Sequence, residues 1–488
     1  MGHTRGISHS RTAREVQKVP HKMKKNMEVK TAALELGTER IRKLLMQYSV
    51  PAIIAMTASS LYNMVDSIFI GQGVGPLAIS GLALTFPLMN LSAAFGAMVG
   101  VGAATMISMR LGQRDYDTAK QVLGNVVVLN TIIGIAFAVV MLLFLDPVLY
   151  FFGASEATLP YAREYMEIIL LGNVVTHMYL GLNAVLRAAG HPRKSMYATI
   201  ITVILNAILD PLFIFVFDWG IRGAAIATIL AQIVTLCWQL KILSNRDELL
   251  HFRRGIYRLK RKIVENILSI GLSPFLMNLA ACFIAIIINK GFKEHGGDLM
   301  IGAYGITNRV AFLFVMVVMG LNQGMQPIAG YNYGARQYDR VLRVLRLTLY
   351  GATLLSIFAF LVGEFAPRVV VRLFTNDEEL IALAVTGMRL SFIMFPVVGF
   401  QMVATNFFQS LGMASKAIFL SLTRQLLFLL PCLLFLPRMF MSLTPWEGSW
   451  GVWCSLPASD LMAAIVTAIL LVRQLRRFNT EISTNNHA

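Results

Sequence analysis

Long runs of apolar residues, separated by short polar segments, recur along the whole chain. One run begins near Leu44 and contains the stretch YNMVDSIFIG, Tyr62 to Gly71. An apolar run of about 18 residues or more can cross a bilayer as a helix, which pairs its backbone polar groups within the segment. The pattern therefore predicts an all-α polytopic membrane protein with twelve transmembrane helices. Their expected limits are 44–71, 77–110, 119–145, 160–188, 194–217, 222–243, 264–293, 299–333, 340–364, 379–411, 415–437 and 449–472.

The composition agrees with a membrane protein, and the distribution of the basic residues along the chain explains the positive net charge. Of the 488 residues, 56% are hydrophobic and only 14% are charged, whereas about 25% are charged in a soluble protein. The formal net charge is +17, but 33 of the 43 Lys and Arg residues fall on one side of the predicted membrane, seven on the other and three at membrane depth. Loops rich in Lys and Arg stay in the cytoplasm. We therefore predict cytoplasmic termini, and we attribute the charge to topology rather than to nucleic-acid binding.

Neither the first residues nor the cysteines add a second function. The first 26 residues are basic and have no signal-peptide apolar region, so we expect a solvated tail near anionic lipid head groups. The cysteines have no CxxC or other metal-ligand spacing and are expected to be packing residues. They are Cys237, Cys282, Cys432 and Cys454.

The second part of the chain repeats motifs of the first part at an offset of 222 residues. GQRDYD, Gly112 to Asp117, matches GARQYD, Gly334 to Asp339. The same offset places ISGLALT, from Ile79, on IGAYGIT, from Ile301, and LRAAG, from Leu186, on FQSLG. Because each half would hold six helices, an even number, both halves should insert with the same orientation, as in transporters built from parallel repeats.

The repeat divides the chain into two six-helix lobes. We predict an N-terminal lobe over 44–243 and a C-terminal lobe over 263–477, joined by a cytoplasmic linker at 244–262. A basic cytoplasmic tail would occupy 1–43, and a second cytoplasmic tail 478–488. In transporters of this kind the substrate site lies between or within the halves, which rock against each other.

Four oxygen-bearing side chains are expected at similar depth in three helices of the first lobe. Asn206 and Asp210 are four residues apart and share a helix face, while Asp66 and Thr228 lie in the first and sixth spans. Carboxylate, amide and hydroxyl oxygens suit a small hard cation such as Na⁺. Two neighbouring carboxylates also suit a proton, because they cannot both stay ionised easily in a low dielectric. The sequence predicts a coupling site for Na⁺ or H⁺ and does not choose between them.

The alternative interpretation is that these side chains only hold helices together by hydrogen bonds, worth about 0.6 kcal/mol each. That would suffice for Asn206 and Thr228 alone, but two acids at one depth favour a functional site. The second lobe lacks the acid, since the position of Asp66 falls at Ile288 or Asn289. We therefore expect ion coupling to belong to the first lobe.

The remaining charges at membrane depth are expected to be structural or to contact cargo. Asp460 lies about as deep as Arg309 and Arg389, which predicts a buried ion pair with Arg389 or a contact with charged cargo. Arg424 lies nearer the cytoplasm, where its side chain can extend to the membrane surface. His177 is expected to be packed and hydrogen-bonded rather than catalytic.

Several of these stretches resemble the multidrug and toxic compound extrusion (MATE) family, in particular its MepA-like bacterial branch. The resemblance rests on NMVDSIFIG, the repeated G-x-R-x-Y-D motif, LDPLFIF at Leu209 to Phe215 and QPIAGYNYGAR at Gln326 to Arg336, and it covers about residues 40–475. It implies a cation-coupled antiporter whose two six-helix lobes form a V-shaped cavity. It also implies that Asp66 is central to coupling. The remaining residues that it assigns to a first-lobe cation site are Asn206, Asp210 and Thr228.

The expected function is export of organic, often cationic compounds across the bacterial inner membrane by alternating access. The protein would be a secondary transporter that acts as a monomer, with Na⁺ or H⁺ as coupling ion, no cofactor and no catalytic residue.

A flippase for lipid-linked precursors, from the same wider superfamily, is the alternative, and Arg309 and Arg389 would favour it by making the cavity cationic. A membrane enzyme acting on polyprenyl substrates would need clustered acids or histidines at a membrane face, which the sequence lacks. A channel fits the two-lobe repeat less well than a transporter does.

Overall fold

The computed structural model describes residues 35–443 and 448–486, and in these ranges the chain is helical with no strand. The solvated tail expected for the first 26 residues lies outside the described residues. The helices of the first half are α3 (Ile41–Gly73), α4 (Pro76–Gly112), α5 (Tyr116–Leu143), α6 (Leu145–Phe151), α7 (Leu159–Leu171), α8 (Asn173–Ala188), α9 (Pro192–Pro211), the π-helical turn η2 (Leu212–Val216) and α10 (Gly220–Ser244). Those of the second half are α11 (Arg261–Gly334), α12 (Tyr338–Phe365), α13 (Pro367–Arg372), α14 (Glu378–Phe392), α15 (Phe395–Ser410), α16 (Ala414–Leu422), the π-helical turn η3 (Thr423–Leu429), α17 (Leu430–Leu443) and α18 (Gly448–Asn486).

The twelve expected spans are present, but two of them are bent pairs. Within the described residues, ten helices are long and apolar enough to cross a membrane, and counting each bent pair as one span gives twelve. The pairs are α7 with α8, bent by 57°, and α14 with α15, bent by 50°. The second bend coincides with Pro396 in the first turn of α15, where a missing N–H is tolerated because the helix begins there. The all-α polytopic fold is therefore confirmed, with interruptions that the apolar pattern does not reveal.

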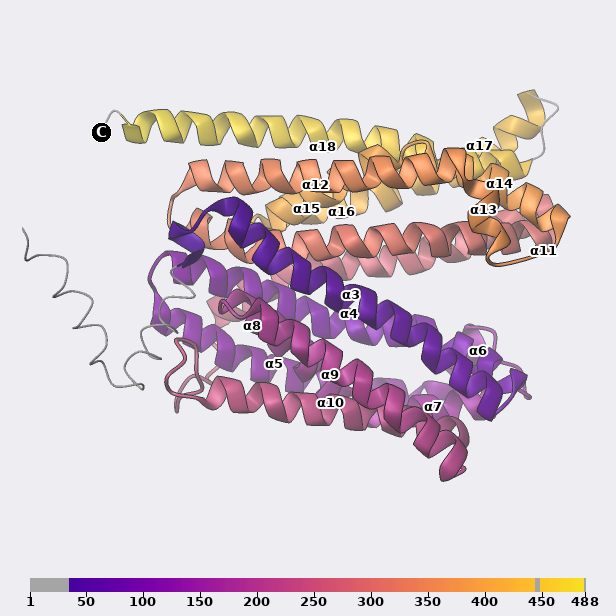
Figure 1. Ribbon diagram of the computed structural model, residues 1–488, viewed down its shortest axis with the longest axis horizontal. Coiled ribbons are helices and arrows are strands. Elements are labelled where there is room, and N and C mark those ends of the chain that lie inside the picture. Colours follow the sequence, from indigo (N-terminus) through magenta and orange to yellow (C-terminus); the bar gives the residue numbers. More distant parts are fainter. Residues whose placement is uncertain (1–34, 444–447, 487–488) are drawn as a thin grey trace, which may run out of the picture.

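Two bundles of helices, one from each half, lie side by side with their long axes nearly parallel (Figure 1). The helix α11 holds two spans that meet at Gly297, where φ is 72°. The first helix of each half packs against the second helix of the other half, since α11 contacts both α3 and α4. At one end of the molecule the two bundles touch, and toward the other end their ribbons diverge (Figure 1).

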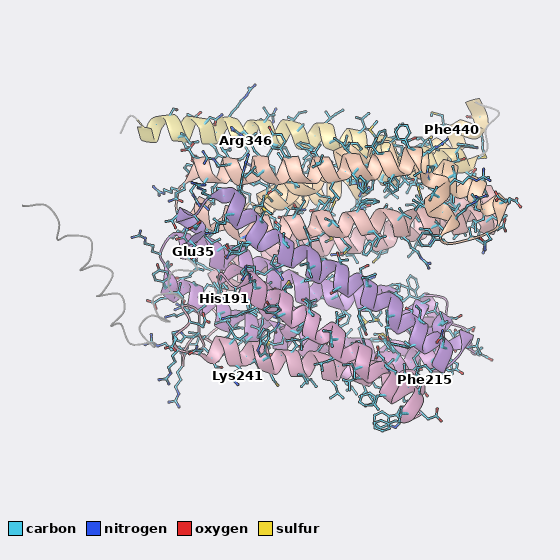
Figure 2. The ribbon with its side chains drawn as sticks, viewed as in Figure 1. Glu35, His191, Phe215, Lys241, Arg346 and Phe440 are labelled. Atoms are coloured by element: carbon cyan, nitrogen blue, oxygen red, sulfur yellow. The ribbon has the colours of Figure 1, made fainter. Side chains whose placement is uncertain are left out.

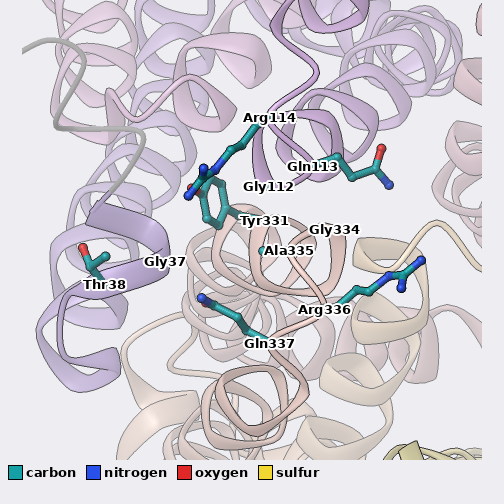
Figure 3. Close-up of a pocket in the computed structure, with 10 residues that line it drawn as sticks. All are labelled: Gly37, Thr38, Gly112, Gln113, Arg114, Tyr331, Gly334, Ala335, Arg336 and Gln337. Carbon is teal, nitrogen blue, oxygen red and sulfur yellow. The ribbon is translucent and has the colours of Figure 1, made fainter. Parts of the chain in front are cut away.

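The repeated G-x-R loops meet where the bundles touch. A Cβ atom on Gly112 would lie 2.0 Å from the carbonyl oxygen of Tyr331, and one on Gly334 would lie 2.1 Å from that of Met109. Arg114 and Arg336, one in each loop, share a rare positive φ of 60° and 58°. The loops line a common cavity of about 450 Å³ (Figure 3). The 222-residue offset found in the sequence thus corresponds to a pseudo-twofold relation between the halves.

The end that carries these loops also carries the linker between the halves, and we call it the basic end. Glu39, His191, Lys194 and Glu248 belong to it, and Figure 2 shows His191 on the same side as Glu35 and opposite to Phe215 and Phe440. Glu248 in the linker accepts hydrogen bonds from Nε2 of His191 at 2.6 Å and Nζ of Lys194 at 2.7 Å. Burial alone would raise the pKa of the Glu248 carboxyl, but these two partners outweigh it and lower the pKa to about 2. The linker is thereby fixed to the start of α9.

Toward the opposite end, apolar side chains of both halves face each other. Phe95 of α4 and Phe275 of α11 have ring centroids 4.6 Å apart. An apolar cavity of about 140 Å³ lies between the halves, lined by residues of α4, the segment around Phe151 and the first span of α11. The halves thus enclose an apolar cavity toward this end, whereas at the basic end their backbones are in close contact.

Candidate cation-binding site

Helices α3, α9 and α10 bring the four predicted site residues together in the first half. The helix α9 packs against both α3 and α10. Asp66 comes from α3, Asn206 and Asp210 from α9, and Thr228 from α10. Asp210 is followed by Pro211 and then by the π-helical turn η2, and such turns often mark functional sites in α-helices.

The polar groups form a connected chain of contacts. Nδ2 of Asn206 donates to Oδ1 of Asp210 at 2.7 Å. The hydroxyl of Thr228 lies 3.4 Å from Oδ1 of Asn206 and 3.0 Å from the carbonyl oxygen of Ala224. The carboxyl groups of Asp66 and Asp210 face each other within interaction distance. The arrangement brings two acids, an amide and a hydroxyl together in one polar cluster.

Both carboxyl groups are buried and incompletely paired. Asp66 is 7% exposed and Asp210 is 0% exposed. Oδ1 of Asp66 and Oδ2 of Asp210 have no hydrogen-bond partner. Buried polar atoms without partners are costly and rare, and a bound cation or proton would satisfy these two. Among the described residues, no group of three or more His, Cys, Asp and Glu side chains could hold a metal ion.

Two tyrosines complete the cluster, and neither was among the predicted site residues. The hydroxyl of Tyr62 lies 3.3 Å from Oγ1 of Thr228. Tyr165 on α7 is 1% exposed and interacts with Thr228 and with both acids. Tyr62 is four residues before Asp66, so helical spacing could have indicated it. Tyr165 carries no such signal, because its position depends on how α7 packs against α10.

The corresponding place in the second half is apolar. At the 222-residue offset, Ile288 replaces Asp66 and Ile284 replaces Tyr62, and both are buried in an apolar cluster that includes Trp453. An isoleucine cluster offers no ligand for a cation. The paired acids therefore distinguish the first half from the second.

The structure corrects the expected partner of Asp460. Oδ1 of Asp460 accepts from Nε of Arg424, whereas Arg389 is exposed and, like the exposed Arg309, forms no ion pair with any described residue. Arg424 lies in the π-helical turn η3, which packs against α18. The prediction of an Arg389–Asp460 pair was wrong because depth along a helix does not reveal which helix is the neighbour. It also follows that Arg424 does not simply extend to the membrane surface.

Replacing Asp460 with asparagine should destabilise the protein, because it leaves the guanidinium of Arg424 without its counter-ion. The Asp460 side chain is 4% exposed and that of Arg424 is 34% exposed. We expect a loss of up to about 3 kcal/mol, lower than for a fully buried pair because Arg424 is partly exposed. The double variant Asp460→Asn with Arg424→Gln should recover part of the loss. Thermal unfolding of the detergent-purified variants measures both effects, and an unchanged midpoint for Asp460→Asn would contradict the pair's structural role.

His177 is packed and hydrogen-bonded, as the sequence predicted. It is 0% exposed, and its Nε2 lies 3.3 Å from Oγ of Ser92. Ser92 also contacts Oδ1 of Asn173, whose amide donates to the carbonyl oxygen of Gly134 at 3.1 Å. These contacts fasten α8 to α4 and α5 beside the bend between α7 and α8.

Comparisons with known proteins identify the family. The MatE family profile matches twice, over residues 51–212 and 273–434, so the two matches begin and end 222 residues apart. Multidrug export protein MepA from Staphylococcus aureus (strain MSSA476) is 26% identical over 434 residues, which are 89% of this chain and 94% of that protein. MepA from Staphylococcus haemolyticus (strain JCSC1435) is 27% identical over 436 residues, with the same coverage.

Solved structures agree with the sequence relatives. A structure described as the outward-facing conformation of a multidrug resistance MATE family transporter of the MOP superfamily superposes with a TM-score of 0.84 at 25% identity, covering 91% of this chain and 98% of the other. A MOP superfamily transporter from Pyrococcus furiosus Vc1 (DSM3638), described as having a binding pocket of reversed polarity, also gives a TM-score of 0.84 at 25% identity, covering 92% and 98%. From its two profile matches, its two-bundle fold and these relatives, the chain belongs to the MatE family and is a multi-pass MATE transporter.

Proposed function

We propose that this protein is a cation-coupled exporter of organic compounds, with its coupling site at Asp66, Asp210, Asn206 and Thr228. The main observation that supports this proposal is the pair of buried carboxyl groups in the first half, each of which has one oxygen without a hydrogen-bond partner. The names of the MepA relatives, which are multidrug export proteins, support small organic molecules as cargo. The cavities lined by both halves support a path for cargo between the bundles.

The coupling would follow from competition between conformations for the cation. A cation that binds the acid pair more tightly in one arrangement of the halves stabilises that arrangement by its difference in affinity. By linkage, cation binding then changes the affinity for cargo by the same factor as cargo binding changes the affinity for the cation. The π-helical turn after Asp210 is an element of the first half whose rearrangement would change the distance between the two acids.

Uptake in proteoliposomes under imposed gradients tests the proposal. The purified full-length protein is reconstituted, and accumulation of a fluorescent lipophilic cation such as ethidium is followed under a Na⁺ gradient, a proton gradient or neither. We expect one of the two gradients to drive accumulation above the level of protein-free vesicles. Equal accumulation with and without either gradient would contradict cation coupling, and no accumulation of any tested organic compound would contradict export itself.

The membrane location is part of the same proposal. The separation of basic residues between the two faces supports a bacterial inner-membrane protein with both termini in the cytoplasm. We further propose that the protein acts as a monomer, since the candidate site is built within one chain.

Flipping of a lipid-linked precursor is the second candidate function. The observation that favours it is that Arg309 and Arg389 are exposed and form no ion pair with any described residue, so they could meet an anionic head group. Neither of them lines the cavity of about 190 Å³ between the halves. Translocation of a fluorescent lipid pyrophosphate in the same proteoliposomes, lost in Arg309→Gln, would favour this function over drug export.

A further inference from the structure

A second polar cavity lies between the halves, away from the candidate cation site. Its volume is about 190 Å³, and residues of α4, α8, α11, α15, α16 and η3 line it. Asparagine and glutamine residues form most of its polar surface, while Met277, Met319 and Met402 supply an apolar and adaptable surface. A lining of amides and thioethers suits an organic molecule with an apolar body and several hydrogen-bonding groups.

Several amide oxygens of the cavity have no partner. Oδ1 of Asn322 and Oε1 of Gln401 and Gln425 form no hydrogen bond. The side chains of Asn322 and Gln401 are each only 6% exposed. An unsatisfied buried acceptor costs free energy that a ligand with N–H or O–H donors can offset. The unpaired oxygens therefore indicate a ligand that carries at least one donor.

The charges that line the cavity do not balance. Two arginines, Arg187 and Arg424, are among the residues that line it. Arg424 is paired with Asp460, whereas Arg187 donates to Oγ of Ser195 at 3.1 Å and pairs with no carboxylate among the described residues. One positive charge is in excess, and a guanidinium group that has no carboxylate beside it can bind the carboxylate of a ligand.

The repeat shows that this charge belongs to one half only. The residue at the 222-residue offset from Arg187 is Gln409, which lines the same cavity. A neutral amide at this position is therefore compatible with the fold of a half. The arginine in the last turn of α8 adds a second guanidinium group to a cavity whose polar lining residues are mainly Asn and Gln.

We propose that this cavity is a cargo site for amphiphilic carboxylates that also carry a hydrogen-bond donor. The carboxylate would pair with Arg187, the donor would satisfy the amide oxygen of Asn322 or Gln401, and the apolar body would contact the methionines. The inference rests on the proposed export function and extends its cargo beyond organic cations. Guanidinium–carboxylate hydrogen bonds are among the strongest in proteins and supply the selectivity for charge.

A matched set of three probes tests the charge class. Indole-3-acetate, indole-3-acetamide and tryptamine share one ring and one N–H donor but carry a negative, neutral and positive side chain. Equilibrium binding of each is measured on the full-length protein in nanodiscs, without any ion gradient. We expect indole-3-acetate to bind at least about tenfold more tightly than the acetamide, as a hydrogen bond between charged groups is worth about 1.5–3 kcal/mol, and tryptamine to bind most weakly. Equal affinities, or a preference for tryptamine, would overturn the proposal.

Variants test whether Arg187 causes the preference for the carboxylate probe. Arg187→Gln, which copies the residue of the other half, should reduce the affinity for indole-3-acetate about tenfold and leave that for the acetamide unchanged. Arg187→Lys should keep most of the preference, and Arg346→Gln, which removes an exposed arginine of α12 outside the cavity, should not alter it. A preference that survives in Arg187→Gln places the carboxylate elsewhere and contradicts the site. The comparison of probes on the unaltered protein decides the charge class even if Arg187→Gln does not fold.

The binding assay also separates this inference from the proposed function. Charge-selective binding without gradient-driven transport would support the cavity and contradict the exporter. Gradient-driven export of ethidium without binding of indole-3-acetate would support the exporter and contradict the cavity.

Discussion

Replacing Asp66 with asparagine should reduce gradient-driven export to the level of protein-free vesicles. Asparagine keeps the size and most of the hydrogen-bonding capacity of the side chain but cannot be ionised. Because Asp66 faces Asp210 inside the first half, the variant would retain one carboxyl group and lose the pair that a cation or proton must neutralise. Insertion into the membrane and affinity for cargo in detergent should remain, since Asp66 lines none of the three cavities described between the halves.

Three further variants test whether a loss of export in Asp66→Asn comes from the missing carboxyl group of the candidate site. Asp210→Asn should give a similar or milder loss, since one carboxyl group would again remain. Thr228→Ala should mainly weaken the dependence on Na⁺ if Na⁺ is the coupling ion, because the hydroxyl would be a ligand of Na⁺ but is not needed by a proton. Asp218→Asn is the matched control, because Asp218 is exposed beyond η2 and has a φ of 55° that asparagine adopts readily. Normal gradient-driven export by Asp66→Asn would return this residue to the role of joining helices.

The sequence predicts the candidate site well because its signals are local. Asn206 and Asp210 share a helix face by their four-residue spacing, and the hydrogen bond between them confirms that geometry. The positions of Asp66 and Thr228 follow from counting residues inward from the ends of apolar runs. Counting works here because α3 and α10 are uninterrupted at these positions, and a helix advances by a constant 1.5 Å per residue.

Counting residues from the ends of apolar runs does not predict a contact that depends on which helices are neighbours. Asp460 and Arg389 lie at similar depth, yet the partner of Asp460 is Arg424, on a π-helical turn packed against α18. Tyr165 joins the acids only because the bent pair α7 and α8 turns its first helix toward α10. Both facts are consequences of tertiary packing, which the apolar pattern of a single helix does not contain.

The close approach of the halves at the basic end depends on glycine. A Cβ atom on Gly271 of α11 would lie 1.8 Å from the carbonyl oxygen of Met98 on α4. The contact between α3 and the second span of α11 is similar, since a Cβ atom on Gly324 would lie 2.6 Å from the backbone nitrogen of Ser49 on α3. Real Cβ atoms do not approach backbone this closely, so any larger residue must push the halves apart. The glycines therefore allow the backbone contact that keeps the basic end closed.

Replacing Gly271 with alanine should open the basic end and strongly reduce transport. Forcing a methyl group into a packed interface costs about 1–3 kcal/mol, and this cost falls only on the conformation in which the halves touch. At 1.4 kcal/mol per factor of ten, the population of that conformation should fall by about five- to 150-fold relative to one with separated halves. Transport by alternating access needs both conformations, so the rate of export should fall with it.

Gly305 is the matched control for this change, because it lies in the same helix and a Cβ atom there would meet nothing within 4 Å. Gly305→Ala should leave export unchanged and stabilise the helix by up to about 1 kcal/mol, the difference in helix propensity. The direct measurement is the distance between spin labels at Gln113 and Gln337, which line the cavity shared by the two repeated loops, in a variant whose four cysteines are replaced by serine. Gly271→Ala should lengthen this distance and Gly305→Ala should not. An unchanged distance and a normal export rate in Gly271→Ala would show that the contact between α4 and α11 does not control the opening of the basic end.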